Sequence, residues 1–449
     1  MSFNTDKQTL NDLNMMGKAG SDSIYSLYNN TCTRGGADIL EQMFLYPLAD
    51  VSAINNRSRT IQYFSSIKAK FPFKTDQLDS AEIYLSITDQ RTKLSHSDNS
   101  LARKFGQLIS ADGDYKLIYN GIIAIAGLLC SLDDFIGKIK PTAAQTPYKT
   151  DLEEMMALLA DTAIAPLMAE KLTGKLGYTS IVDYDNLLRF SYRLRIKQLL
   201  ASIYKLDVYI SIAEVALKRN YVFPQALVDK MHTVSLTDVY HPLVKNAIAN
   251  TIQITPESNV VFLTGANMAG KSTLMKSLGI ALYLAHMGFP VAAAKMEFSV
   301  RDGMYTTINL PDDLSSGNSH FYAEVLRVKK IAKELGVAKN LFIIFDELFR
   351  GTNVKDAYEG TIAIVEAFAE KRNCMFVVST HIIEAGDVLR ERCSNINFIY
   401  LPTKMDNNTP IYTYKLEPGI TADRHGMIII NNERILEIIR SRKTKTSLS

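Results

Sequence analysis

The segment that most constrains the fold is the loop at residues 265–272, which fits the pattern G-x-x-x-x-G-K-[ST]. A buried-strand pattern precedes it at Val260 to Leu263, and a helical pattern follows at Thr273 to Leu284. Glycines at both ends let successive backbone N–H groups turn toward one anion, at the N-terminus of a helix. The alternative is a chance match in a glycine-containing turn. The flanking strand and helix favour a phosphate-binding loop.

The chemistry of such a loop assigns expected roles to its residues. Lys271 would place its charge between the β- and γ-phosphates of a nucleotide, and Ser272 would offer its hydroxyl to Mg²⁺. The expected nucleotide-binding residues are Gly265, Ala266, Asn267, Met268, Ala269, Gly270, Lys271, Ser272 and Thr273.

A second buried strand, Leu341 to Phe345, ends in the acidic pair Asp346 and Glu347. Acids at the tip of a central parallel strand lie where α/β sheets bind their ligands. We expect Asp346 to hold Mg²⁺ and Glu347 to polarise the attacking water. Taken alone, the pair could equally be an acidic helix cap.

A third strand, Met375 to Val378, is followed by Ser379, Thr380 and His381. His381 could donate a hydrogen bond to the γ-phosphate and report its hydrolysis. The alternative is a structural histidine, which is the commoner case for a lone histidine at a strand end.

A serine- and glycine-rich segment, Leu314 to Phe321, precedes a strongly periodic helix, with Ser319 as the expected N-cap. Such a loop is a second anion site, and one nucleotide does not need two from one subunit. We therefore expect a dimer in which Ser319 completes the partner's site. The alternative is an ordinary capped helix. The expected apolar stripe of this helix is Phe321, Val325, Val328, Ile331, Ala332 and Leu335.

Together these segments resemble the ATPase domain of the MutS family of DNA mismatch repair proteins. Residues 264–273 follow the family's T-G-P-N-M-G-G-K-S-T, and residues 346–352 its D-E-L-G-R-G-T. Further matches are Asp312 to Glu324, Thr380-His381, Tyr240-His241-Pro242 and Lys415 to Gly419. A weaker match, to the family's helical core domain, runs from Arg34 to Arg57.

The resemblance implies a fold class, cofactors and partners. It implies a doubly wound α/β P-loop NTPase domain of the ABC type, preceded by a mostly α-helical core and lever domain. The implied boundaries are 1–235, 236–430 and a basic C-terminal tail at 431–449. ATP and Mg²⁺ are the implied cofactors, and a homodimer, DNA and a repair protein are the implied partners.

The chain also departs from the family's pattern. Ala266 and Ala269 replace a proline and a glycine, but both are small enough to keep phosphate binding. His320 stands where a threonine is usual, which affects the expected rate of hydrolysis. The F-x-E motif of the mismatch readers occurs only at 345–347 and 368–370, inside the ATPase region. We therefore expect a short member without the mismatch-recognition domain and with a reduced or absent clamp.

The first 235 residues are mostly helical by pattern. One long apolar stripe consists of Ile196, Leu199, Ile203, Leu206, Ile210, Ala213 and Leu217. Pro141 and Pro147 predict a loop from Lys138 to Lys149, and a second break falls at Leu172 to Gly174. Lysines alternate with Phe71 and Phe73 near residue 70, a pattern of nucleic-acid grips but more often of an amphipathic edge.

Composition sets further limits. A formal net charge of +3 is too small to imply nucleic acid by itself. The four cysteines have no metal spacing, which is typical of a reduced cytoplasmic protein, and we expect no signal peptide. The longest apolar run, 121–132, is shorter than the ~20 residues of a membrane span and predicts a core helix.

Three functions remain open from the sequence. The first is an ATP-gated DNA clamp of the mismatch-repair type, with or without mismatch specificity. The second is a mechanochemical ATPase acting on a protein partner or a branched nucleic acid. The third is a transporter-type ATP-binding cassette, suggested by Leu314 to Gly317 but opposed by the lack of a membrane-span pattern.

Overall fold

The computed structural model describes residues 3–17, 22–94, 96, 112–173, 176–228, 231–309, 320–337, 339–406, 409–421 and 434–440. The chain forms two compact units. The first, here called the α/β unit, comprises Met1–Leu27, Tyr46–Asn55 and Arg219–Ser449. The second, the helical unit, comprises Tyr28–Leu45 and Asn56–Lys218. The predicted boundaries at 235 and 430 stay predictions about sequence domains, since these units interleave along the chain.

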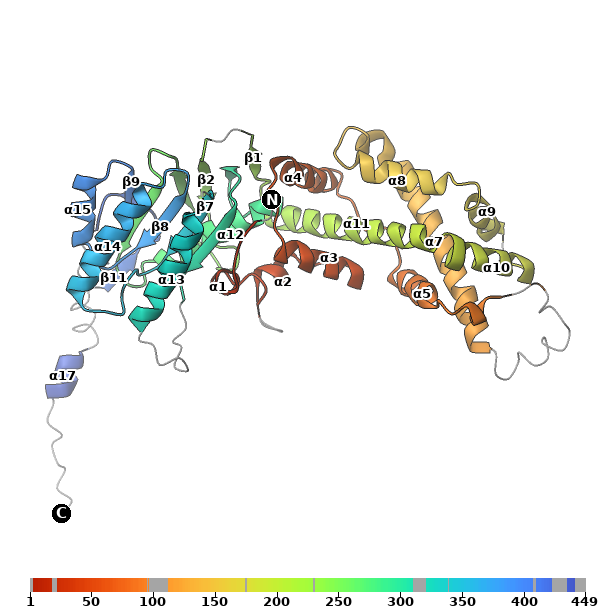
Figure 1. The fold of residues 1–449 in the computed structure, drawn as a ribbon, viewed down its shortest axis with the longest axis horizontal. Helices are drawn as coiled ribbons and strands as arrows, with labels where there is room; N and C mark the ends of the chain where they lie inside the picture. Colours follow the sequence, from red (N-terminus) through yellow and green to blue (C-terminus); the bar gives the residue numbers. More distant parts are fainter. Residues whose placement is uncertain are drawn as a thin grey trace, which may run out of the picture. The chain divides into compact units, whose positions relative to one another are not determined.

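A six-stranded sheet forms the centre of the α/β unit (Figure 1). Its order is β12 (Glu417–Pro418), β9 (Ile396–Leu401), β4 (Val260–Gly265), β8 (Met375–Ser379), β7 (Leu341–Phe345) and β6 (Gly303–Thr307). All neighbouring pairs are parallel except β12 with β9. Strands β4, β6, β7 and β8 are buried along their whole length, as expected for parallel strands covered on both faces. The three strands predicted before the loop, the acids and the histidine are all confirmed.

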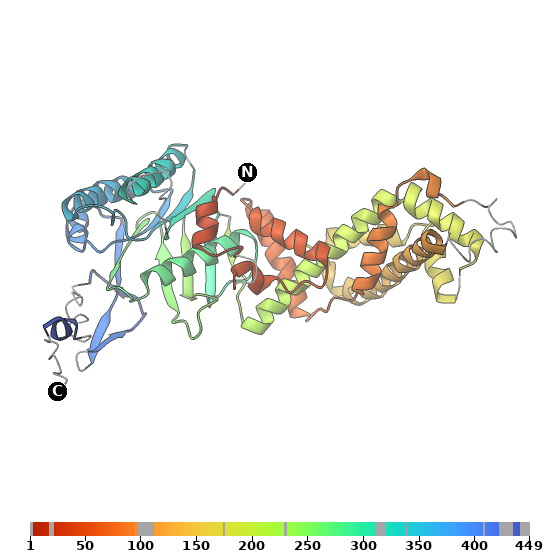
Figure 2. The same cartoon turned by 90° about the horizontal axis from the view of Figure 1, so that it is seen from below.

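Helices cover both faces of this sheet (Figure 2). On one face, α13 (His320–Leu335), α14 (Val354–Ala369) and α15 (Glu384–Arg392) share a core with alternate residues of β4, β7 and β8. On the other face lies α12 (Lys271–His286), where Gly279 packs near Ile344 of β7. Most of the predicted α13 stripe is at least partly buried, but Ala332 is exposed because its position lies at the edge of the apolar arc.

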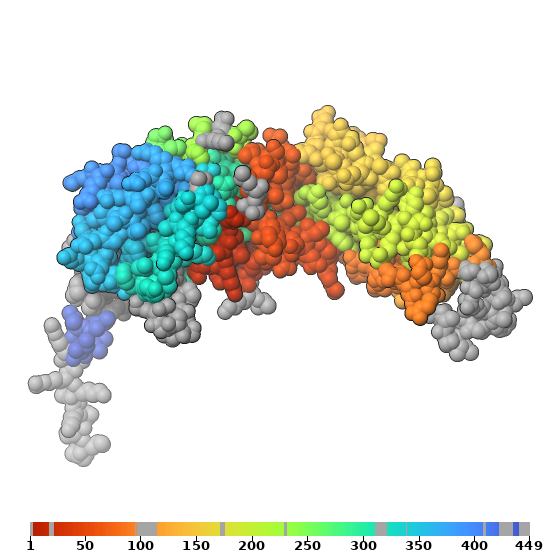
Figure 3. Space-filling model, viewed as in Figure 1, coloured from red at the N-terminus to blue at the C-terminus, as the bar shows by residue number. Residues whose placement is uncertain are grey.

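The N-terminal residues complete the open edge of the sheet. Asn4 pairs with Gly303 in a parallel β-bridge, and helix α1 (Lys7–Asp12) follows. Asp6 caps α1 and forms ion pairs with Arg327 and Lys330 of α13. The Asp12 carboxylate accepts a hydrogen bond from the Thr306 hydroxyl at 2.7 Å. Figure 3 shows these dark red residues seated beside α13, which is drawn in cyan.

A second sheet in the same unit has the order β1 (Gln225–Leu227), β5 (Lys295–Ser299), β2 (Val234–Val239) and β3 (Asn250–Ile254). In β3 and much of β2, buried residues alternate with less buried ones, so one face packs inward. A hairpin joins β10 (Thr403–Asp406) to β11 (Thr409–Tyr412). The mixed α/β part of the fold prediction is confirmed.

The helical unit contains the longest helices of the described residues. These are α7 (Asp112–Ala143), with 32 residues, and α11 (Arg193–Arg219), with 27. The shorter elements, some of which begin or end in the α/β unit, are α2 (Ile24–Tyr28), α3 (Arg34–Leu45), α4 (Val51–Ser66), α5 (Thr75–Ser86), η1 (Gln90–Thr92), α8 (Lys149–Leu159), α9 (Ala165–Thr173), α10 (Tyr178–Asp185) and the π-helical turn η3 (Asn186–Ser191). The predicted stripe of α11 is buried except for Leu217, which is 44% exposed near the end of the helix. None of the described helices is long and apolar enough to cross a membrane.

Two sequence predictions in this unit are corrected or refined. Helix α7 continues through Pro141, where a loop was predicted. Proline removes one N–H and crowds the carbonyl four residues earlier, but here the helix ends at Ala143, within one turn of Pro141. Near residue 70, Lys70 forms an ion pair with Glu214 and Phe73 is buried, as in an amphipathic edge.

The close packing of α7 on α5 gives a stability prediction. A β-carbon at Gly121 would overlap Cβ and Cγ of Tyr84, which is itself fully buried. We expect Gly121→Ala to destabilise the helical unit by about 1–3 kcal/mol, because these atoms lie close to the backbone and cannot move aside cheaply. Gly137→Ala is the matched control, since nothing lies within 4 Å of the added carbon. It should stabilise the helix by about 0.5–1 kcal/mol. Urea unfolding followed by circular dichroism measures both, and equal midpoints would contradict this packing.

Candidate nucleotide-binding site

The loop between β4 and α12 has the backbone conformation that its glycines allow. Gly265 has a φ of +146° and Gly270 a φ of +98°, in the region that favours glycine. At Gly265, a β-carbon would also lie 3.1 Å from the carbonyl oxygen of Leu401. Met268, at the tip, is 75% exposed. The predicted strand, loop and helix are therefore all present, and α12 begins at Lys271.

Lys271 folds back over its own loop. Its side chain is 5% exposed, and Nζ donates hydrogen bonds to the carbonyls of Gly265 at 2.8 Å and Ala266 at 3.3 Å. Burial lowers the pKa of Lys271, and the carboxylates of Asp346 and Glu347 partly oppose that effect. The ammonium group is thus held against the loop, where both of these hydrogen bonds go to backbone carbonyls.

Strand β7 delivers the acidic pair to the same place. The Ser272 hydroxyl donates a short hydrogen bond to Asp346 Oδ2. The Ser379 hydroxyl, at the end of β8, donates to Asp346 Oδ1 at 2.5 Å. The structure thus brings the two predicted Mg²⁺ ligands, Ser272 and Asp346, into contact.

Glu347 and His381 face each other across the ends of β7 and β8. His381 Nε2 lies 2.7 Å from Glu347 Oε1, and Arg350 donates to Glu347 Oε2 at 3.0 Å. The hydrogen bond from His381 lowers the pKa of Glu347 most, and Arg350 adds to it, so that the pKa falls to about 2 although burial opposes the shift. Glu347 is therefore a carboxylate at neutral pH.

Ser379 organises this pair in a way that the sequence did not predict. Its hydroxyl accepts a hydrogen bond from the Glu347 backbone N–H at 3.0 Å while donating to Asp346. Its carbonyl accepts from the Leu348 N–H at 3.2 Å. Only the position of Ser379 at a strand end could have suggested this role.

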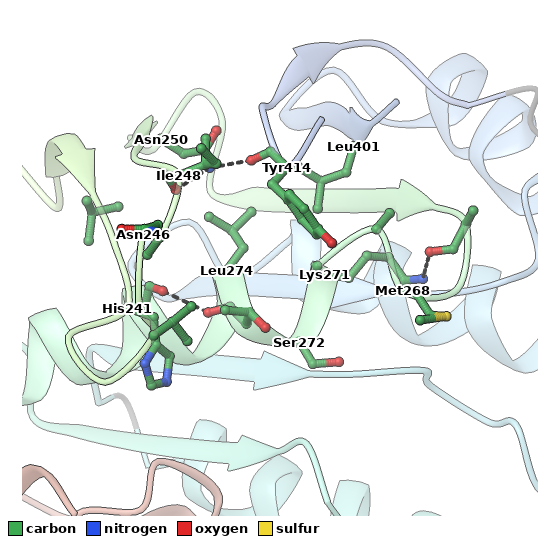
Figure 4. Close-up of a pocket in the computed structure, with 18 of the residues that line it drawn as sticks. His241, Asn246, Ile248, Asn250, Met268, Lys271, Ser272, Leu274, Leu401 and Tyr414 are labelled. Carbon is green, nitrogen blue, oxygen red and sulfur yellow. Dashed lines mark hydrogen bonds between the residues drawn. The ribbon is translucent and has the colours of Figure 1, made fainter. Parts of the chain in front are cut away.

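A cavity of about 550 Å³ adjoins the loop (Figure 4). Beyond the loop it is lined by His241 and Ile248 on one side and by Leu401 and Tyr414 on another. The Tyr414 ring points toward the loop in Figure 4, and His241 lies at the opposite end. Burial, and then the charge of Lys276, lower the pKa of His241. The cavity therefore combines a cationic, N–H-rich end with a partly apolar one.

Asn250 fixes the segment that carries Tyr414. Its Nδ2 donates to the Tyr414 carbonyl at 2.9 Å, and its Oδ1 accepts from the Leu416 N–H at 2.8 Å. Neither Tyr414 nor Asn250 was predicted as a site residue. Tyr414 directly precedes the matched segment at 415–419, and Asn250 follows the segment at 240–242 by eight positions; these matches were the available signal.

Part of this chain is similar in sequence to known proteins. Residues 261–447 match the family model described as MutS domain V. The chain is 29% identical to the DNA mismatch repair protein MutS of Macrococcus caseolyticus over 267 residues, 58% of this chain and 31% of that protein. It is 30% identical to the MutS of Staphylococcus haemolyticus over 243 residues, 53% of this chain and 27% of that protein.

The chain is therefore similar to MutS proteins over more than half of its length, and its residues 261–447 match MutS domain V. MutS of Streptococcus pyogenes serotype M49 gives a similar match, 28% identical over 53% of this chain and 28% of the relative. The chain therefore spans less than a third of the length of these curated MutS proteins.

One departure from the MutS pattern lies at the acidic turn. The family's D-E-L-G-R-G-T has a glycine where this chain has Phe349, which adopts a φ of +63°. Glu347 itself has a φ of +53°. The sequence prediction missed this conformation, although the glycine of the family's motif at position 349 was an available signal.

One predicted MutS site residue cannot be placed. Ser319 lies outside the described residues, as does the side chain of His320. Most of the predicted basic tail also lies outside them, and its described part is the short helix α17 (Ile435–Arg440).

Proposed function

We propose that this chain is a MutS-type ATPase, which binds ATP with Mg²⁺ at residues 265–273 and hydrolyses it. The supporting observation is the convergence of Lys271, the Ser272–Asp346 contact and the Glu347–His381 contact at the carboxyl ends of three neighbouring strands. Ligands of open α/β sheets bind at that edge.

The oxygen donors suit Mg²⁺. A serine hydroxyl and a carboxylate already touch, and both are hard ligands of the kind that Mg²⁺ prefers. Among the described residues, no group of three or more His, Cys, Asp and Glu side chains is placed to hold a metal. Mg²⁺ commonly keeps waters and substrate phosphates as further ligands. Bound between Ser272 and Asp346, it would neutralise charge on the phosphates.

Lys271 and the loop would hold the triphosphate. Phosphate oxygens would replace the carbonyls of Gly265 and Ala266 as partners of Nζ, and the N–H groups at the start of α12 would face the anion. The partly apolar end of the cavity has room for a base, with the Tyr414 ring as a stacking surface and Ile248 nearby.

Glu347 would orient the attacking water and accept its proton. In the free site, His381 and Arg350 keep its pKa too low for an effective base. A γ-phosphate would compete for His381 and Arg350, and its negative charge would raise the proton affinity of Glu347. The substrate itself would thereby activate the base, and His381 would return to Glu347 after hydrolysis.

The proposed assembly is a homodimer in which Ser319 of one subunit completes the site of the other. The proposed target is DNA, because the matched relatives are named DNA mismatch repair proteins. The long α7 and α11 of the helical unit are suited to act as levers that convert ATP turnover into movement.

A DNA titration tests the target. Fluorescence anisotropy with homoduplex, mismatched, branched and single-stranded DNA, with and without ATP, should show ATP-dependent binding of duplex or branched DNA. Binding should weaken between two salt concentrations, because phosphate contacts release counterions. Lys271→Ala is the control that should lose the effect of ATP. Absence of DNA binding in all conditions would favour an ATPase acting on a protein partner.

A further inference from the structure

The turn between β7 and α14 contains two left-handed residues that are not glycine, Glu347 and Phe349. A left-handed conformation is uncommon for residues with a β-carbon and is an outlier for bulky ones. Such a residue persists only where its surroundings enforce the conformation, and such residues cluster at functional sites. Here the first of the pair is the proposed catalytic carboxylate.

The side chain of Phe349 supplies one half of that enforcement. It is 6% exposed and lies in a slot between α13 and α14. Its ring meets Phe321 of α13 edge-on, with centroids 5.8 Å apart. On the other side it lies against Gly360 of α14, where an added β-carbon would be 3.1 Å from Cδ2 and 3.2 Å from Cε2. The slot is open to the ring because residue 360 has no side chain.

Backbone hydrogen bonds also help to enforce the left-handed turn. The N–H groups of Glu347 and Leu348 donate to the hydroxyl and carbonyl of Ser379, at 3.0 and 3.2 Å. Glu347 is thus held to β8 on one side, and the chain two residues later is held by the Phe349 ring. Between these anchors, the Glu347 carboxylate contacts His381 and Arg350.

We propose that Phe349 is a positioning residue, whose ring in the α13–α14 slot fixes the turn that aims the Glu347 carboxylate. The proposal rests on the ATPase function proposed above. It makes turnover depend on the spacing between α13 and α14, since widening or narrowing the slot would rotate the turn. The competing interpretation is that Phe349 only fills the core.

Gly360→Ala separates these interpretations. The added methyl pushes the Phe349 ring by a few tenths of an ångström, while alanine in a helix interior favours the fold. We expect kcat for ATP to fall about tenfold, since misplacement by 1 Å costs on the order of 10². The Kd for ATP should change less than about twofold, because the phosphate loop is untouched. Gly137→Ala, the same substitution in open space, should leave kcat at the wild-type value.

A double-mutant cycle completes the test. Leucine at position 349 leaves room for the methyl, so Gly360→Ala should have less than about a twofold effect on kcat in the Phe349→Leu background. Thermal unfolding monitors the fold of every variant. Unchanged kcat in folded Gly360→Ala and in folded Phe349→Leu would overturn the positioning role.

The outcomes distinguish this proposal from the proposed function. If the wild-type chain and the Gly360→Ala variant turn over ATP equally fast, only the positioning role of Phe349 is contradicted. A wild-type chain that binds no ATP, or a Glu347→Gln variant that retains full turnover, counts against the site itself.

Discussion

Replacing Lys271 with alanine is expected to abolish ATP binding at micromolar concentrations. The ammonium group is buried, and within the described part of the chain it donates hydrogen bonds to the loop carbonyls that the phosphates would displace. Losing a buried, charge-assisted contact to phosphate costs about 3 kcal/mol, a factor on the order of 10² in Kd. Isothermal titration calorimetry with ATP and Mg²⁺ measures this change.

The unfolding temperature of Lys271→Ala without nucleotide shows whether the variant has lost ATP binding alone or has also lost its fold. Burial lowers the pKa of Lys271, so keeping the ammonium charged costs free energy in the free protein. Lys271→Ala should therefore unfold at the same temperature as the wild type or higher, in the absence of nucleotide. Lys355→Ala is the control, because that side chain is 83% exposed on α14. Unchanged ATP affinity in the Lys271→Ala variant would remove the loop from the proposed mechanism.

Glu347→Gln is expected to bind ATP and fail to hydrolyse it. Glutamine keeps the size of the side chain and can still meet His381, but it cannot accept a proton from water. Loss of a general base typically lowers a rate by about 10²–10⁴. Single-turnover measurement of phosphate release tests this step, and Glu359→Gln, an exposed acid of α14, is the matched control.

The same variant tests the shared site. Trapped ATP should stabilise the dimer, because the γ-phosphate would remain in place for Ser319 of the partner. Gel filtration with light scattering should then show a dimer with ATP and Mg²⁺. A Glu347→Gln chain that stays monomeric with ATP bound would contradict the completion of the site by a partner subunit.

The parts of the site that sequence could predict are those encoded locally. Three local segments were predicted: the loop at 265–272, the strand before the acids and the strand before His381. Each has a recognisable pattern of residues, and each is present in the structure. Their convergence also follows from sequence, because parallel strands place their carboxyl ends at one edge.

The parts that could not be predicted depend on contacts between distant residues. In the sequence, Ser379 looks like any serine at the end of a strand. Its role depends on the two acids that β7 places beside it. Phe349 adopts a conformation against its own preference, because a slot between two helices accepts its ring. The backbone carbonyl of Tyr414, beside the cavity, accepts a hydrogen bond from Asn250, 164 positions away. No local period or propensity reports such contacts.

The attachment of Asn4 to Gly303 has a consequence for biosynthesis. Residues at the beginning of this sequence complete a sheet edge whose strand is encoded about 300 positions later. At about 5–20 residues per second, a ribosome needs roughly 15–60 s to make that stretch. During that time, Arg327 and Thr306, the partners of Asp6 and Asp12, have not yet been synthesised. While the helical unit is being made, the segment from Asn4 to Asp12 thus exists before the sheet that it joins, and it is open to chaperones until translation has passed α13.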